Sequence, residues 1–266
     1  MRIHRQASGL AGLVLTCLGL NACQSVPKPS GYLSRYDTVG SAQAPMGAAR
    51  AQRRDDAASD NLTAVYIQPA VLALQTPSRL SAQDQEKVRA EVDRQVCFEI
   101  SERFDVLAAP APDAGLVRTA IVRITPTGRF GSAVSAAAGF FIPAPILNVR
   151  TPTTTGGLAA ETELLAPGGE QIAALRWSRT AEVVSSVNPS MSRVGDALQL
   201  AEPYGDAVGD AFASEARKVR KIADPDPCAR FGVRRDIGRS LASGVVGVGS
   251  GLYVPEISGA GKAAVD

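Results

Sequence analysis

The sequence predicts an α+β fold: a mixed or antiparallel sheet of about four or five strands, with two main helices on one face. Two observations carry this prediction. A long amphipathic helix follows one strand-like segment, and a second helical region follows several more strand-like segments. This order of elements favours a single sheet that is covered by helices on one side.

The first helix has a clear start and a clear apolar stripe. Ser81 is a typical N-cap, and Asp84 stands three residues later, near the positive end of the helix dipole. Apolar residues then recur every four positions, which is the spacing of one buried helix face. They are Val88, Val92, Val96, Ile100 and Phe104. A strand rich in β-formers is predicted before this helix, over residues 62–71.

The remaining elements follow from turn residues and short apolar runs. Strands are predicted over residues 104–108 and 116–125, and a hairpin over 158–166 and 171–180. Proline and two glycines between the hairpin strands supply the turn. A last helical region is predicted from about residue 194 to residue 221, with Tyr204 on its buried side.

The N-terminus has the three parts of a secretory signal peptide over residues 1–22. Two arginines precede an apolar stretch over 10–20, and Leu20-Asn21-Ala22-Cys23 follows. The small Ala22 before a cysteine is typical of a lipobox, so we expect cleavage before Cys23 and lipidation of that residue. The alternative is an ordinary signal peptide with a coincidental cysteine.

Lipidation at Cys23 would make the membrane the first partner of this protein, through its lipid anchor. Two or more acyl chains, including palmitate, give stable attachment to a bilayer. Gln24 follows the cysteine in place of the Asp that retains enterobacterial lipoproteins in the inner membrane. We therefore expect a cell-envelope protein that is anchored in the outer membrane and faces the periplasm.

The charge and histidine content argue against several functional classes. The chain has 28 basic and 26 acidic residues, and loss of two arginines with the signal peptide leaves the mature protein formally neutral. No nucleic-acid partner is therefore expected. The single histidine, His4, leaves with the signal peptide, which excludes histidine-dependent nucleophiles and metal sites. We expect no enzyme activity, no cofactor and no metal.

The chain divides into four predicted regions. The signal peptide over 1–22 precedes a disordered, lipidated tether over 23–60, a single α+β domain over 61–222 and a flexible tail over 223–266. The aromatic residues of segment 30–37 are spaced as if this part of the tether docks onto the domain.

Several of these segments together resemble a known family. They are Ser30-Gly31-Tyr32-Leu33 with Tyr36, the strand at 66–69, the helix opened by Leu80-Ser81, the strands at 117–125 and 161–163, and the helix around Tyr204. In this order and spacing, over about residues 30 to 220, the chain resembles the bacterial lipoprotein family called domain of unknown function 3313. The resemblance implies an envelope location and this fold, without a mechanism.

Cys97 and Cys228 are the remaining cysteines of the mature chain. In an oxidising compartment such a pair favours a disulfide. The alternative is a free Cys97 buried on the apolar face of the first helix.

The uncharged segment 133–147 also has two interpretations. It contains Phe140, Phe141 and Ile142, which would contact a membrane or a partner if the segment were an insertion. The simpler interpretation, which we favour, is a short core helix that ends at the prolines.

The carboxylates of Glu161 and Glu163 share one face of a strand, about 7 Å apart. Such a pair can do acid–base chemistry in a pocket or bind Ca²⁺, but on a half-exposed strand it is usually a solvated face. The leading hypothesis is a non-catalytic lipoprotein that binds a protein or polymer partner in the periplasm. The alternatives are a subunit of an outer-membrane export or assembly complex, with 133–147 inserted, and a carboxylate-dependent enzyme.

Overall fold

The computed structural model describes residues 26–40, 48–128, 148–149, 155–181, 184–185 and 192–232. The predicted signal peptide, Cys23 and the segment 133–147 with Phe140, Phe141 and Ile142 lie outside the described residues. So does the chain from 233 onward.

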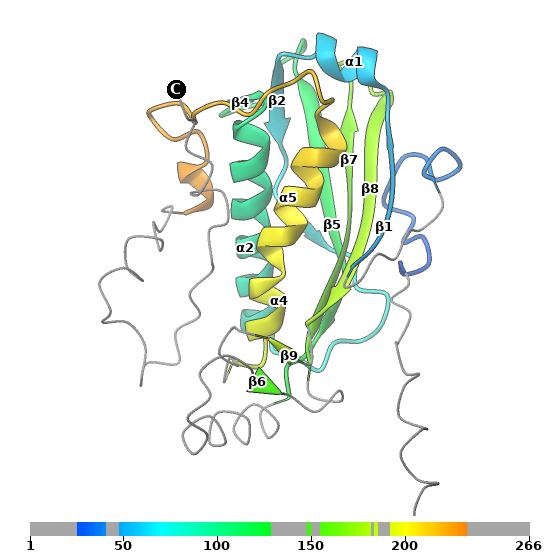
Figure 1. Cartoon of the computed structure of the whole chain (residues 1–266), viewed down its shortest axis with the longest axis vertical. Helices are drawn as coiled ribbons and strands as arrows, with labels where there is room; N and C mark the ends of the chain where they lie inside the picture. Colours follow the sequence, from blue (N-terminus) through cyan, green and yellow to red (C-terminus); the bar gives the residue numbers. More distant parts are fainter. Residues whose placement is uncertain are drawn as a thin grey trace, which may run out of the picture.

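The described elements form a mixed sheet with helices on one side (Figure 1). The strands are β1 (Ala48–Arg54), β2 (Ala64–Ile67), β3 (Val71–Leu72), β4 (Asp105–Leu107), β5 (Gly115–Thr125), β6 (Asn148–Val149), β7 (Gly157–Leu165), β8 (Gln171–Thr180) and β9 (Val184–Ser185). The helices are α1 (Asp56–Asn61), α2 (Ala82–Ser101), α4 (Gly195–Gln199), α5 (Ala201–Phe212) and the 3-10 turn η2 (Ala229–Phe231).

The main sheet has seven strands, in the order β1-β8-β7-β5-β2-β4, with β3 also paired to β5. Strands β1, β8, β7 and β5 are antiparallel neighbours, whereas β2, β3 and β4 join by parallel pairing. β6 and β9 form a separate two-stranded sheet. The predicted α+β class, with two main helices on one face, is confirmed, and the sheet is larger than predicted.

The local signals for α2 and the β7–β8 hairpin work as predicted. The Ser81 hydroxyl accepts a hydrogen bond from the backbone N–H of Asp84, and α2 begins at the next residue after this cap. In the hairpin turn, Gly169 has a φ of +84°, a conformation that residues with a Cβ rarely adopt. The hairpin strands then pair along almost their whole length.

The face of the sheet under α2, α4 and α5, here called the helix face, holds the main apolar core. The largest fully buried side chains of this core include Phe104, Phe212 and Tyr204. Helices α2 and α5 approach closely at Gly205, where an added Cβ would lie 2.9 Å from the backbone oxygen of Gln95. Glycine is therefore needed at this contact.

The folded unit begins earlier than predicted. Strand β1 and helix α1 lie inside the predicted tether, and β1 pairs with β8 over all seven of its residues. The segment was hard to predict because alanine and arginine are weak β-formers. Ala49 and Ala51 are nevertheless buried.

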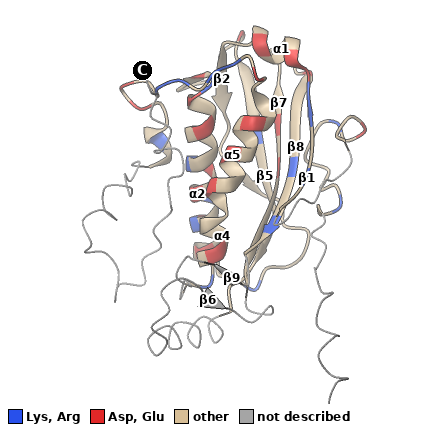
Figure 2. Cartoon of the chain, in the orientation of Figure 1, with Lys and Arg blue, Asp and Glu red and all other residues tan. Residues whose placement is uncertain are grey.

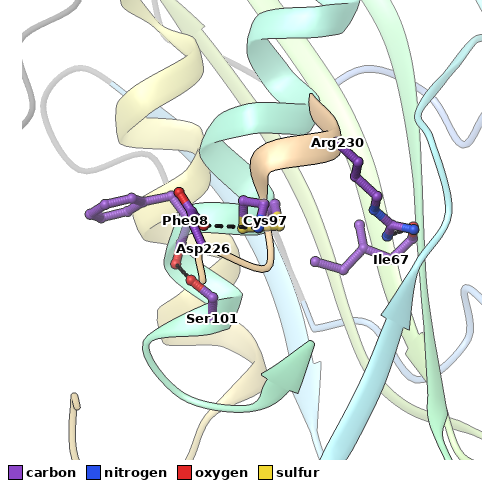
Figure 3. The surroundings of a disulfide bond; sticks show 7 residues. Ile67, Cys97, Phe98, Ser101, Asp226 and Arg230 are labelled. Atoms are coloured by element: carbon purple, nitrogen blue, oxygen red, sulfur yellow. Dashed lines mark hydrogen bonds between the residues drawn. A yellow bond between two sulfur atoms is a disulfide. The ribbon is translucent and has the colours of Figure 1, made fainter. Parts of the chain in front are cut away.

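The folded unit also ends later than predicted. Cys228, within the predicted tail, forms a disulfide with Cys97 of α2, with an S–S distance of 2.08 Å (Figure 3). Arg230 in η2 donates hydrogen bonds to the backbone oxygens of Ile67 and Ala108. These contacts attach the described residues up to 232 to α2 and β2, so a free tail cannot begin at residue 223.

Candidate functional site

The opposite face of the sheet is covered by residues 26–40, here called the strap. This strap face consists of β5, β7 and β8, and the strap lies across it, away from the helices (Figure 1). Under the strap the strands carry small apolar residues, Ala120, Val122 and Ala159. These small side chains leave space for the strap, and Tyr32 packs against them.

Glu161 and Glu163 lie on this face and are only 1% and 0% exposed. The sequence predicted that both side chains lie on one face of a strand. They do, because side chains two positions apart along β7 point to the same face. The expectation of a solvated pair is wrong, because the strap covers both side chains. Burial of two carboxylates is costly unless each is paired and hydrogen-bonded.

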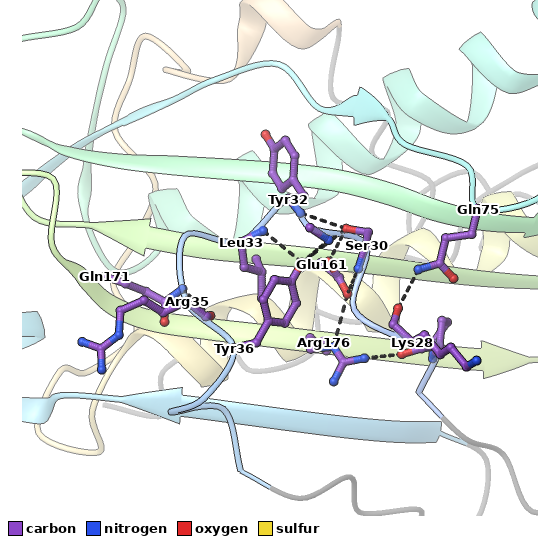
Figure 4. Close-up of polar contacts among 12 residues, drawn as sticks. Lys28, Ser30, Tyr32, Leu33, Arg35, Tyr36, Gln75, Glu161, Gln171 and Arg176 are labelled. Carbon is purple, nitrogen blue, oxygen red and sulfur yellow. Dashed lines mark hydrogen bonds and ion pairs between the residues drawn. The ribbon is translucent and has the colours of Figure 1, made fainter.

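Glu161 receives its partners from both the strap and the sheet (Figure 4). The hydroxyl groups of Ser30 and Tyr36 donate to its carboxylate at 2.5 and 2.7 Å. From the neighbouring strand, Arg176 forms an ion pair with it at 3.2 Å, and the same guanidinium donates to the backbone oxygen of Pro27. Glu161 therefore joins the start of the strap to β8.

Glu163 holds the middle of the strap. The backbone N–H and the hydroxyl of Ser34 donate to one carboxylate oxygen at 2.8 and 2.7 Å, and the Gln171 amide donates to the same oxygen at 2.8 Å. Arg118 forms an ion pair with the other oxygen at 3.1 Å. Each buried glutamate thus has one arginine and several neutral donors, which offset the cost of its burial.

The strap is folded around the hydroxyl group of Tyr36. This oxygen accepts hydrogen bonds from the backbone N–H groups of Gly31 and Leu33, at 2.9 and 3.1 Å, while it donates to Glu161. Burial raises the pKa of Tyr36, so the hydroxyl keeps the proton that it donates. Gly31 has a φ of +86°, which favours glycine at this turn.

The sequence motif around Tyr32 is explained by these contacts. The guanidinium of Arg118 lies over the Tyr32 ring, 4.8 Å from its centre, and Leu33 is buried with 4% exposure. The spacing of Tyr32, Leu33 and Tyr36 indicated docking from sequence alone. Nothing local in the sequence indicated that Glu161 and Glu163 are the groups on which the segment docks.

This arrangement is suited to holding a peptide segment. The carboxylate oxygens already accept hydrogen bonds from strap donors, so a substrate would have to displace the strap to reach them. Among the described residues, no group of three or more histidine, cysteine or acidic side chains could hold a metal ion. In the same part of the chain, no helix is long and apolar enough to span a bilayer.

A separate cavity of about 310 Å³ lies between α2, η2 and the end of β2. Its lining includes Arg89, Asp93 and Arg230. Burial raises the pKa of Asp93 to about 6, although Arg89 forms an ion pair with it at 2.5 Å. This cavity could not be predicted from the sequence, because its walls come from three distant segments.

Several other residues with potential binding side chains have structural positions. Trp177 and Tyr204 are buried in the core of the helix face, with ring centres 5.4 Å apart. The Tyr204 hydroxyl contacts Thr162 of β7. Cys97 and Cys228 are the disulfide described above.

Solved structures that resemble this chain have low sequence identity to it. The PelC dodecamer from Paraburkholderia phytofirmans is 11% identical, and the match covers 63% of this chain and 99% of that one, with a TM-score of 0.37. A variant of that dodecamer gives 9% identity, coverage of 63% and 98%, and a TM-score of 0.35. A DUF4136 family protein from Bacteroides thetaiotaomicron gives 8% identity, coverage of 64% and 99%, and a TM-score of 0.32.

No curated protein matches the sequence. The family model described as "Protein of unknown function (DUF3313)" matches residues 28–208. This region includes most of the strap, the main sheet and most of α5, and agrees with the family predicted from the sequence motifs. The chain belongs to the DUF3313 family.

Proposed function

We propose that this protein is a non-catalytic envelope lipoprotein, anchored by acylated Cys23 in the outer membrane, with a domain that binds a protein or polymer partner in the periplasm. One observation carries the proposal beyond the sequence motif. The strap makes its first contact with the domain at Pro27, where Arg176 donates to the backbone oxygen. Only four residue steps separate this contact from Cys23.

A tether of this length restricts the position of the domain. Four residues span at most about 14 Å when fully extended. The strap therefore makes residues 26–40 part of the anchored domain and leaves a very short connection to the lipid. With the strap released, the connection would run from Cys23 to β1 at Ala48, and could span roughly 80 Å. The contacts of Glu161 and Glu163 thus set the reach of the domain.

The absence of catalysis is supported by two features. The only histidine precedes the expected cleavage site. The two buried glutamates of the strap face are also occupied by strap donors and by their own arginines. A carboxylate-dependent reaction would require an unoccupied pair at this face.

Lipidation is tested by growing a Gram-negative host that expresses the full chain with an alkyne analogue of palmitate. We expect the wild-type chain to be labelled and to fractionate with the outer membrane. Cys23→Ala should lose both the label and the membrane association. Cys17→Ala is the matched control, because it removes a cysteine of the apolar stretch. A Cys23→Ala chain that keeps the label would overturn the anchor.

The partner is tested by cross-linking in intact cells, followed by purification of the lipidated chain. We expect a stoichiometric envelope protein or polymer to co-purify with it. An integral outer-membrane protein as the main product would favour the export-complex alternative, and the absence of any stoichiometric partner would contradict both hypotheses.

A further inference from the structure

The strap places the anchor on one particular side of the domain. Its contacts with Gln75, Glu161 and Arg176 hold residues 27–30 against the strap face. Because Pro27 is only four residue steps from Cys23, the anchor must leave the domain on this side. Helices α2 and α5 lie on the other side of the sheet (Figure 1).

The main helices and the strap face differ in charge. Helices α2, α4 and α5 contain nine acidic and three basic residues. In Figure 2, the strands and the strap carry blue segments as well as a few red ones, whereas the helices carry more red. The basic residues of this side are Lys28, Arg35, Arg53, Arg118, Arg123 and Arg176.

The acidic residues of the strap face contribute little exposed negative charge. Glu161 and Glu163 are buried and paired with arginines, so Asp37 and Glu170 are the exposed acids among the described residues of this side. Lys28, Arg35 and Arg123 are exposed. Arg35 forms an ion pair with Asp37, and the three exposed cations outnumber the two exposed acids by one. The outermost charge of the strap face is therefore weakly cationic.

From the anchor position and this charge distribution, we infer that the strap face lies against the membrane and contacts anionic lipid headgroups. The inference rests on the proposed anchor at Cys23. Charges act over about 8 Å at physiological ionic strength, so a cation contributes only when it is held near the surface. Four residues reach at most about 14 Å, so the start of the strap with Lys28 stays close to the membrane surface, and the acidic helices then face the periplasm.

The orientation is measured with the full lipidated chain in vesicles that contain a headgroup-linked quencher. A fluorophore is attached to a cysteine that replaces exposed Asp37 on the strap, or exposed Gln83 on α2. In phosphatidylglycerol vesicles we expect the label at 37 to be quenched several-fold more than the label at 83. Equal quenching at the two positions would overturn the inference.

The role of charge is tested by composition and by substitution. In vesicles of neutral phosphatidylcholine, the difference between the two labels should shrink. The variant Lys28→Gln, Arg35→Gln, Arg123→Gln should behave in phosphatidylglycerol as the parent does in phosphatidylcholine. The matched control is Lys87→Gln, Lys218→Gln, Lys221→Gln, which removes the same charge from exposed positions outside the strap face and should change nothing.

The outcomes separate the two proposals. A label difference that is the same in both lipids and in the triple variant would overturn headgroup contact, while the anchor at Cys23 would stand. Loss of the protein from the vesicle fraction would overturn the anchor itself, and with it the inference.

Discussion

The two faces of the sheet are covered by different physical means. On the helix face, α2 and α5 bury large apolar side chains, and each contributes about 1.5–3 kcal/mol when fully buried. On the strap face, small alanine and valine side chains provide little apolar area, and the strap is held mainly by hydrogen bonds to Glu161 and Glu163.

This difference sets the expected order of opening. Hydrogen bonds to charged groups contribute about 1.5–3 kcal/mol each, but the cost of desolvating the charges offsets much of that. The strap also contains no helix or strand of its own among residues 26–40. We therefore expect the helix face to determine global stability, and the strap to open locally without unfolding of the domain.

The largest effect should come from a substitution in the helix face. Phe212→Ala removes a fully buried ring at the end of α5, and such changes cost about 3–5 kcal/mol. Urea denaturation monitored by circular dichroism should show a lower midpoint for the whole domain. A loss below about 1 kcal/mol would show that α5 is not part of the cooperative core.

A substitution in the strap face should have a smaller and local effect. Glu163→Ala removes the acceptor of Ser34 and Gln171 and leaves Arg118 without its carboxylate. We expect residues 26–40 to lose about 2–3 kcal/mol of protection in hydrogen exchange, while α5 keeps its protection.

The matched control for that substitution is Glu170→Ala, which removes an exposed glutamate from the nearby hairpin turn. It should leave strap exchange unchanged. If Glu163→Ala weakened α5 as much as the strap, the two faces would form one cooperative unit, and the strap would not open independently of the domain.

Elements with local sequence signals could be predicted, and elements that depend on tertiary contacts could not. Helix α2 could be predicted because its signals are local: a cap at Ser81 and an apolar residue at every fourth position. Strand β1 could not, since its alanine and arginine residues acquire β structure only by pairing with β8. Tertiary pairing decides such segments more than propensity does.

The docking of the strap could be predicted from the sequence, but the residues on which it docks could not. The aromatic spacing at 32–36 indicated that the segment docks, because that pattern is local. Its anchor residue Glu161 is 125 positions away from Tyr36, so the hydrogen bond depends on the whole fold. The pairing of Cys97 with Cys228, 131 positions apart, was left open by the sequence because it likewise depends on the fold.

A pH-dependent effect concerns a carboxyl group between the helices, which lacks the balanced partners of the strap-face glutamates. Glu99 of α2 is buried beside Asp206 and Glu102, with Arg103 as the nearby cation. Burial, together with the negative charge of Asp206 and Glu102, raises the pKa of Glu99 to about 8. In the folded protein it therefore stays protonated at pH values where it ionises in the unfolded chain.

The sign of the pH effect follows from this raised pKa. Below the ordinary glutamate pKa, both states are protonated and stability is unaffected. As the pH rises from about 5 to 8, ionisation of the unfolded chain lowers the free energy of unfolding. Glu99→Gln should remove this decline in urea denaturation series between pH 5 and pH 8, whereas Glu86→Gln, at an exposed position on the same helix, should retain it. A decline that persists in Glu99→Gln would assign the pH dependence to another group, such as Asp93, whose pKa burial raises to about 6.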